Sequence, residues 1–142
     1  MSGKAVSGAM YIFSGGIANN EYTNSQGSIY ISSGGMANST LLNSGYMYIS
    51  SGGVANCTNL NSGGMYIISG GLANSTTINY AGWMNLYSGG IASNTAINSF
   101  GRLYISDGGV AINTAVSSDG RMEVSDGGVA SNTAINYGGS MS

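Results

Sequence analysis

The feature that most constrains the fold is a Gly-Gly pair, preceded by Ser or Asp, that recurs through almost the whole chain. It occurs seven times at steps of 19, 18, 18, 19, 19 and 19 residues, and one further pair, Gly63-Gly64, belongs to the turn that ends a unit. A fixed period of this length is typical of repeat architectures. No unit shows a sustained 3.6-residue period, and regularly spaced glycine pairs break helices, so the sequence argues against a helical fold. The pairs begin at Gly15, Gly34, Gly52, Gly70, Gly89, Gly108 and Gly127.

Each glycine pair is preceded by a short stretch in which apolar residues occupy alternate positions. "MYISS" at positions 47–51 is one example. Alternation with a period of two predicts a half-buried strand, with the apolar residues facing inward. The inward pairs are Met10 and Ile12, Ile29 and Ile31, Met47 and Ile49, Met65 and Ile67, Met84 and Leu86, Leu103 and Ile105, and Met122 and Val124.

The segment after each glycine pair is also repeated. An aliphatic residue is followed by alanine in every unit. Six units then carry a threonine at a fixed offset: Thr40, Thr58, Thr76, Thr95, Thr114 and Thr133. Two residues later comes a mostly aliphatic position, with Thr23 as the exception: Leu42, Leu60, Ile78, Ile97, Val116 and Ile135.

These units predict an all-β, single-domain parallel β-solenoid, or β-helix. A unit of 18–19 residues cannot bury its own apolar face, but it can do so when stacked on a copy of itself. With strands about 4.8 Å apart, seven coils give a rod about 34 Å long. Glycines are expected at corners that need a positive φ or a close backbone approach, and asparagines in hydrogen-bonded ladders. An antiparallel meander is the alternative, but the near-identity of the units favours stacking in register. The crossover preference predicts a right-handed coil.

The expected domain spans residues 1–142. Residues 1–9 form a partial N-terminal coil, residues 10–139 the seven repeats, and residues 140–142 the start of an eighth coil. Solenoids normally close with polar caps, and no such segment is evident, so both ends are expected to be uncapped. Open ends of this kind can complement each other between molecules, and such a contact builds a filament.

The composition excludes several functional classes. The net charge of −2 gives no electrostatic reason to bind nucleic acid or an anionic membrane, and no apolar run reaches the roughly 20 residues that span a bilayer. The first ten residues lack the apolar region of a secretory signal. Histidine is absent and Cys57 is the single cysteine, so we expect no disulfide, catalytic site, cofactor or metal. Cys57 itself fits a small residue at a tolerant turn.

Four charged residues align one coil apart. Asp107 and Asp126 replace the Ser that precedes the glycines in the other units. A paired-carboxylate enzyme of the glycosidase type and a calcium site are conceivable, but the sequence favours exposed corner residues. Arg102 and Arg121 are expected to make solvated pairs with nearby acids.

A tyrosine recurs between the two inward residues of the first strand, and it should therefore point outward. The ladder is interrupted by Asn85 and ends at Glu123. Stacking of the tyrosines on one another is the favoured interpretation, and filament contact or sugar binding stays open. The tyrosines are Tyr11, Tyr30, Tyr48, Tyr66 and Tyr104.

The segments "SSGGVANCTNLNSGG" (Ser50–Gly64) and "ISGGLANSTTINYAG" (Ile68–Gly82) resemble passenger repeats of AIDA-type bacterial autotransporter adhesins. The resemblance extends from Met10 to about Gly139. It implies a right-handed β-helix on the bacterial surface that promotes adhesion or self-aggregation. In some members of the family a dedicated glycosyltransferase heptosylates repeat serines. The matching positions are Ser14, Ser33, Ser51, Ser69 and Ser88 before the glycines, and Ser44 and Ser62 in the following turn.

Two functions follow as hypotheses, and neither is enzymatic. The first is a structural subunit that assembles head to tail with copies of itself into an extracellular or cell-surface filament. The alternative is a repeat fragment of an autotransporter adhesin, whose partners are glycans or a host surface. Both place the chain outside the cell, without membrane insertion or nucleic-acid binding.

Overall fold

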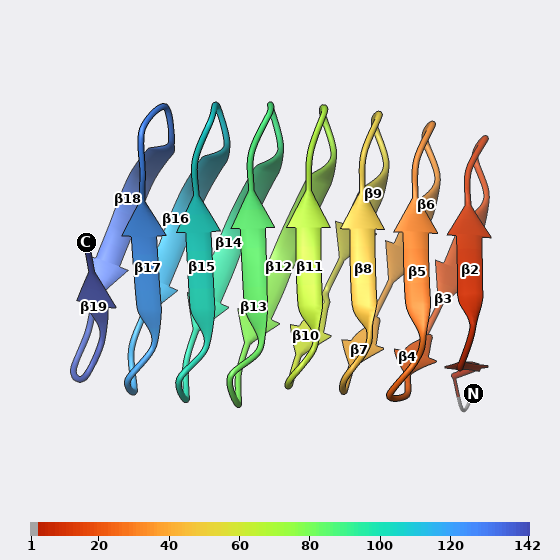
Figure 1. The fold of residues 1–142 in the computed structure, drawn as a ribbon, viewed down its shortest axis with the longest axis horizontal. Helices are drawn as coiled ribbons and strands as arrows, with labels where there is room; N and C mark the ends of the chain where they lie inside the picture. Colours follow the sequence, from red (N-terminus) through yellow and green to blue (C-terminus); the bar gives the residue numbers. More distant parts are fainter. Residues whose placement is uncertain (1–2) are drawn as a thin grey trace.

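The computed structural model describes residues 3–142 and shows two parallel β-sheets wound into one solenoid (Figure 1). In Figure 1 the chain rises through the front sheet, crosses at the top, descends behind, and advances from right to left. This path is that of a right-handed helix. Every paired strand runs parallel to its neighbour, so the predicted β-solenoid is confirmed and the antiparallel alternative is wrong. Met1 and Ser2 of the expected N-terminal partial coil lie outside the described residues.

The front sheet has eight strands, one from each coil. They are β2 (Ala9–Ile12), β5 (Ser28–Ile31), β8 (Tyr46–Ile49), β11 (Gly64–Ile67), β13 (Trp83–Leu86), β15 (Arg102–Ile105), β17 (Arg121–Val124) and β19 (Ser140–Met141). We call it the eight-stranded sheet. Its inward side packs against the second sheet, and its outward side carries the predicted tyrosines.

The rear sheet has eleven strands and contains the segments that follow the glycine pairs. Its short strands are β1 (Ala5–Val6), β3 (Ile17–Asn19), β4 (Tyr22–Thr23), β6 (Met36–Asn38), β7 (Leu41–Leu42), β9 (Val54–Asn56) and β10 (Asn59–Leu60). Its longer strands are β12 (Leu72–Ile78), β14 (Ile91–Ile97), β16 (Val110–Val116) and β18 (Val129–Ile135). In the later coils, one continuous strand therefore replaces the two short ones of the earlier coils.

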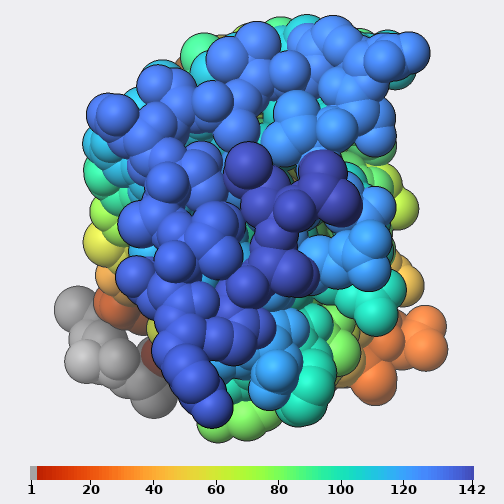
Figure 2. Space-filling model, turned by 90° about the vertical axis from the view of Figure 1, so that its left-hand side faces the viewer, coloured from red at the N-terminus to blue at the C-terminus, as the bar shows by residue number. Residues whose placement is uncertain are grey.

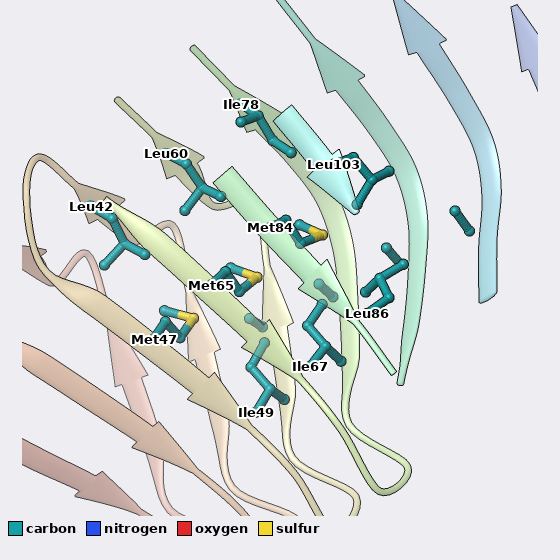
Figure 3. Packing of buried hydrophobic residues seen from close by; sticks show 14 of the residues in the cluster. Leu42, Met47, Ile49, Leu60, Met65, Ile67, Ile78, Met84, Leu86 and Leu103 are labelled. Carbon is teal, nitrogen blue, oxygen red and sulfur yellow. The ribbon is translucent and has the colours of Figure 1, made fainter. Parts of the chain in front are cut away.

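The interior consists of columns in which each residue lies over its counterpart in the next coil. Met65 of β11 is paired with Met47 of β8 on one side and with Met84 of β13 on the other. Figure 3 shows this methionine column beside a column containing Ile49 and Ile67. These side chains are fully buried. Since the same residue types recur at each step, every coil covers the apolar face of the one before it.

The two glycines of each pair serve different purposes, as Gly52 and Gly53 illustrate. Gly52 has a φ of +79°, and Ser51 before it has a φ of 48°. The N–H of Gly53 donates to the carbonyl of Ser50 at 2.8 Å, which closes a two-residue turn of the primed type. A Cβ on Gly53 would lie 2.5 Å from the carbonyl oxygen of Ile31. The first glycine thus permits the turn, and the second permits close stacking.

A second left-handed position bends the rear sheet in the middle of each coil. Cys57 occupies it with a φ of 56°, and its side chain is exposed, as expected for a tolerant turn residue. The residues in this column are Asn20, Ser39, Cys57, Ser75, Asn94, Asn113 and Asn132. Three of the asparagines form a ladder, with amide-to-carbonyl distances of 3.3 and 3.2 Å. Asparagine suits this position because its side chain tolerates the left-handed region.

The repeated threonines form a buried polar column beside the apolar ones. Thr76 of β12 is paired with Thr95 of β14, and Thr95 with Thr114 of β16. Their hydroxyl oxygens have no hydrogen-bond partner among the described residues. At the N-terminal end, Glu21 occupies the position of the threonine and is only 9% exposed. The backbone shows this alignment, since the carbonyl of Glu21 accepts a hydrogen bond from the N–H of Leu41, the residue after Thr40.

Candidate functional site

The outward side of the eight-stranded sheet carries a continuous stack of tyrosine rings. Ring centroids lie 4.9 Å apart between Tyr11 and Tyr30, 4.9 Å between Tyr30 and Tyr48, and 5.1 Å between Tyr48 and Tyr66. The rings are within 12° of parallel. Burial in this stack raises the pKa of Tyr48, and the neighbouring phenols of Tyr30 and Tyr66 add to the effect.

The stack ends at β13, where a groove of about 680 Å³ opens. Asn85 stands in the tyrosine column there, paired with Tyr66 of β11 on one side and with Tyr104 of β15 on the other. Trp83 and Tyr87 flank it two residues away along the chain. The groove is lined by Tyr66, Ala81, Trp83, Asn85, Tyr87, Phe100, Arg102, Tyr104 and Ser106. Asn85 therefore has an aromatic neighbour on each side along the strand and in each adjacent coil, and Phe100 adds a fifth aromatic side chain to the lining.

The position of Trp83 is determined by the coil before it. Gly64 is the residue paired with Trp83, and a Cβ on Gly64 would lie 2.3 Å from the indole ring. The indole contacts Tyr66 edge-on, with ring centroids 4.9 Å apart and an interplanar angle of 79°. The ring therefore lies over the space left by the missing side chain, and Gly64→Ala would displace it.

The groove also presents polar groups. The Oδ1 atom of Asn85 is buried and has no hydrogen-bond partner among the described residues. A guanidinium nitrogen of Arg102 donates to the hydroxyl of Tyr104 at 3.3 Å, and this bond raises the pKa of Arg102. Burial raises the pKa of Tyr87, with the neighbouring Tyr66 as a second cause. The groove therefore presents phenol groups, the guanidinium of Arg102 and the side-chain amide of Asn85, whose Oδ1 atom is buried.

The serines implied by the family resemblance all lie exposed at turns. Ser14, Ser33, Ser51, Ser69 and Ser88 have positive φ values at the corner before the glycines, and Ser44 and Ser62 occupy the opposite turn. Ser62 differs from the others because its hydroxyl donates to the carbonyl of Asn43. The first five form one column on the surface, since successive coils are in register.

Of the four aligned charged residues, Arg102 lines the groove, whereas Arg121, Asp107 and Asp126 are not among its lining residues. Asp107 and Asp126 are exposed at neighbouring corners, where the N–H of Asp107 donates to the carbonyl of Asp126 at 3.0 Å. Within residues 3–142 no three His, Cys, Asp or Glu side chains are grouped so that they could hold a metal. Arg121 pairs with Glu123 at 2.8 Å, whereas Arg102 bonds Tyr104 instead.

Sequence reasoning noted that Asn85 interrupts the tyrosine column but did not identify the groove. The signal was present: Asn85 replaces an aromatic residue in a repeat where neighbours in adjacent coils are aligned. The contribution of Trp83 was harder to see, because it depends on the absence of a side chain at Gly64, one coil earlier.

Comparison with known proteins supports the repeat assignment. Residues 88–139 match the AIDA family model, described as an adhesin of the bacterial autotransporter system, probable stalk. The solved structure of a TibC-catalyzed, hyper-glycosylated TibA fragment is similar over 96% of this chain, with 42% identity and a TM-score of 0.93. The repeats of this chain are therefore similar to AIDA-type passenger repeats. The chain spans 51% of the TibA fragment.

A search of curated proteins gave no match. Over the described part of the chain, no helix is long and apolar enough to span a membrane. The assignment of the AIDA-type repeats therefore rests on the family model together with the TibA fragment.

Proposed function

We propose that this chain is a non-enzymatic stalk segment of a bacterial autotransporter adhesin, exposed on the cell surface. The observation that carries the proposal is an unbroken parallel solenoid made of AIDA-type repeats, with a fold like that of the TibA fragment. In this role the chain forms a single repeat domain. Its coils hold the surface features described above at fixed spacings along a rigid rod.

Surface labelling of the producing cells tests this role. Antibodies raised against the folded chain should label intact cells, and protease added outside should remove the label. Deletion of the coding segment should reduce adherence or autoaggregation relative to the parent cells. Label found only after permeabilisation would contradict the proposal.

The exposed serine column is the proposed site of sugar attachment. TibA is glycosylated by TibC, and the corner serines of this chain are exposed and lie about 4.8 Å apart in successive coils. The proposed positions are Ser14, Ser33, Ser51, Ser69 and Ser88, with Ser44 and Ser62 in the opposite turn. Ser62 should be modified least, since its hydroxyl is already donated to Asn43.

Co-expression with TibC, followed by peptide mass spectrometry, tests the sugar sites. Ser51→Ala should remove the sugar from its peptide. Ser50→Ala is the matched control, because Ser50 is adjacent but half-buried, and it should leave the pattern unchanged. An unmodified protein, or sugars at half-buried serines instead of the corner serines, would contradict the assignment.

Head-to-tail assembly into a filament is a second candidate, supported by the exposed apolar groups at both ends. Ile135 and Met141 in the last coil are 44% and 51% exposed, although their counterparts Ile97 and Met84 are fully buried. Figure 2 looks onto this C-terminal end. Either a continuing chain or a second copy would cover it in the same way. The partner in this hypothesis is a further molecule of the same chain.

Electron microscopy and sedimentation of the purified chain distinguish these cases. Filaments that disappear in Ile135→Asp, but persist in Ser118→Asp on the exposed rim, would support assembly. A monodisperse monomer at high concentration would contradict filament formation while leaving the stalk role intact.

A further inference from the structure

We propose that the groove around Asn85 binds a pyranose ring of a saccharide. The site lies on the outward side of β11, β13 and β15, and its lining includes none of the corner serines proposed for sugar attachment. It goes beyond the stalk role, because it is a receptor for a sugar from another molecule rather than a point of attachment. It rests on the geometry of one coil and its two neighbours.

The apolar part of the groove fits the C–H face of a sugar ring. Trp83, Tyr66, Tyr87 and Tyr104 surround the small Asn85, so the floor is recessed and the rim is aromatic. Sites for small ligands are usually apolar and aromatic with few polar groups, and this groove has that composition. The indole ring is held in place by contact with Tyr66 and by its position over Gly64, which reduces the entropy lost on binding.

The polar part of the groove fits the hydroxyl groups at the edge of a sugar. A hydroxyl group both donates and accepts hydrogen bonds. The side-chain amide of Asn85 lines the groove, and an amide can both donate and accept hydrogen bonds with a ligand hydroxyl. Arg102 and the phenol of Tyr104 supply donors beside it.

The same observations disfavour the other ligand classes. An extended peptide needs a free strand edge, but β13 is paired with β11 and β15 along its whole length. A cation would be repelled by Arg102, and the lining residues include no carboxylate in the part of the chain described. A saccharide, with an apolar face and hydroxylated edges, matches both halves of the groove.

The groove is bounded along the rod because tyrosine fills the same column in both adjacent coils. Tyrosine occupies this column in β2, β5, β8, β11 and β15. The rings in the four consecutive coils from β2 to β11 stack on one another. Asn85→Tyr would therefore restore the repeat pattern and fill the groove. Because tyrosine already occupies this position in five other coils, the substitution should abolish saccharide binding without lowering the free energy of unfolding.

Trp83 is the only tryptophan in the chain, so its fluorescence reports directly on the groove. The unglycosylated protein should be titrated with methyl α-mannoside, methyl β-galactoside, methyl β-glucoside, methyl N-acetyl-β-glucosaminide and N-acetyllactosamine up to about 10 mM, which covers weak single-site affinities. At least one probe should give a saturable change in emission. Saturation-transfer NMR with the same probes detects binding that leaves the emission unchanged.

Variants locate the binding. Asn85→Tyr should weaken it at least about tenfold while preserving the thermal unfolding midpoint, and Arg102→Gln should weaken it about threefold, as expected for one hydrogen bond. Tyr30→Ser, outside the groove, should bind like the parent chain. No saturable binding of any probe by either method, or equal binding by Asn85→Tyr, would overturn the proposal.

Discussion

The interior of the solenoid and the outward side of its eight-stranded sheet are made from the same strands, yet they tolerate change differently. Inside, methionine, leucine or isoleucine recurs at one position in every coil, as at Met65, Leu103 and Ile29. Outside, one column passes from Tyr66 to Asn85 and then back to tyrosine, without any shift of strand register.

The difference follows from what each side chain must cover. An interior residue has to fill space left by the coils on both sides, so a change in one coil is felt in two others. An outward residue contacts its neighbours but also solvent, so one coil can depart from the pattern at little cost. Repetition therefore specifies the fold, and departures from repetition on the outside are where binding sites can arise.

The strongest test of this comparison uses the adjacent glycines Gly52 and Gly53. Gly53→Ala should lower the free energy of unfolding by about 4 kcal/mol or more, because its Cβ would lie 2.5 Å from the Ile31 carbonyl. Gly52→Ala has space but a φ of +79°, so about 1–2 kcal/mol is expected. Urea unfolding measures both. Equal losses would contradict the separate roles assigned to the two glycines.

An interior and an outward residue of the same strand give the next largest contrast. Met65→Ala should cost about 3 kcal/mol, since Met65 is fully buried in its column. Tyr66→Ala should cost about 1 kcal/mol, mainly lost ring contacts. Thermal unfolding followed by circular dichroism compares them. If Tyr66→Ala proved the more damaging, the outward face would be as constrained as the core.

The threonine column sharpens the comparison, since it places polar groups in the interior. Thr76→Val removes a buried hydroxyl that has no hydrogen-bond partner within residues 3–142, and it should raise the free energy of unfolding by about 1 kcal/mol. Thr76→Ala is the matched control and should lower stability, because it leaves a cavity instead. A loss in Thr76→Val would show that the hydroxyl has a partner, such as an ordered water.

The smallest expected effect concerns alkaline pH and the tyrosine stack. The pKa of Tyr48 is raised by burial, so its phenol stabilises the fold fully below its ordinary pKa of about 10, and this contribution is lost as the pH rises through the raised value. Tyr48→Phe keeps the ring and removes the titration. Urea titrations from pH 8 to 11 should show a shallower loss for Tyr48→Phe than for the parent chain. Parallel losses would contradict this account.

Much of the fold could be predicted from sequence because stacking forces equivalent residues into alignment. The spacing of Gly52 and Gly70 gave the coil length, and the alternation at Met47 and Ile49 gave the inward face. The burial of Thr58 was not predicted, although Leu60 lies two residues later and the alternation of a strand places both on one side. The left-handed bend at Cys57 was likewise seen only as a tolerant turn.

The binding groove could be predicted only in part. The break at Asn85 was visible once the coils were aligned. Its enclosure by Trp83 depends on the space at Gly64 and on a ring orientation set by packing between coils. The orientation of the Trp83 ring depends on side-chain packing between adjacent coils, and the repeat period alone does not specify that packing.

The hydrogen bonds between coils run along the length of the rod, and this direction has a mechanical consequence. Tension applied between the two ends loads those bonds one coil at a time rather than all together. We expect each coil to release separately and lengthen the molecule by about 60 Å, the extended length of 18–19 residues. A tether of this kind would unfold in steps under shear and dissipate mechanical energy before its attachment breaks. Single-molecule stretching would record these steps as an evenly spaced series of length increases.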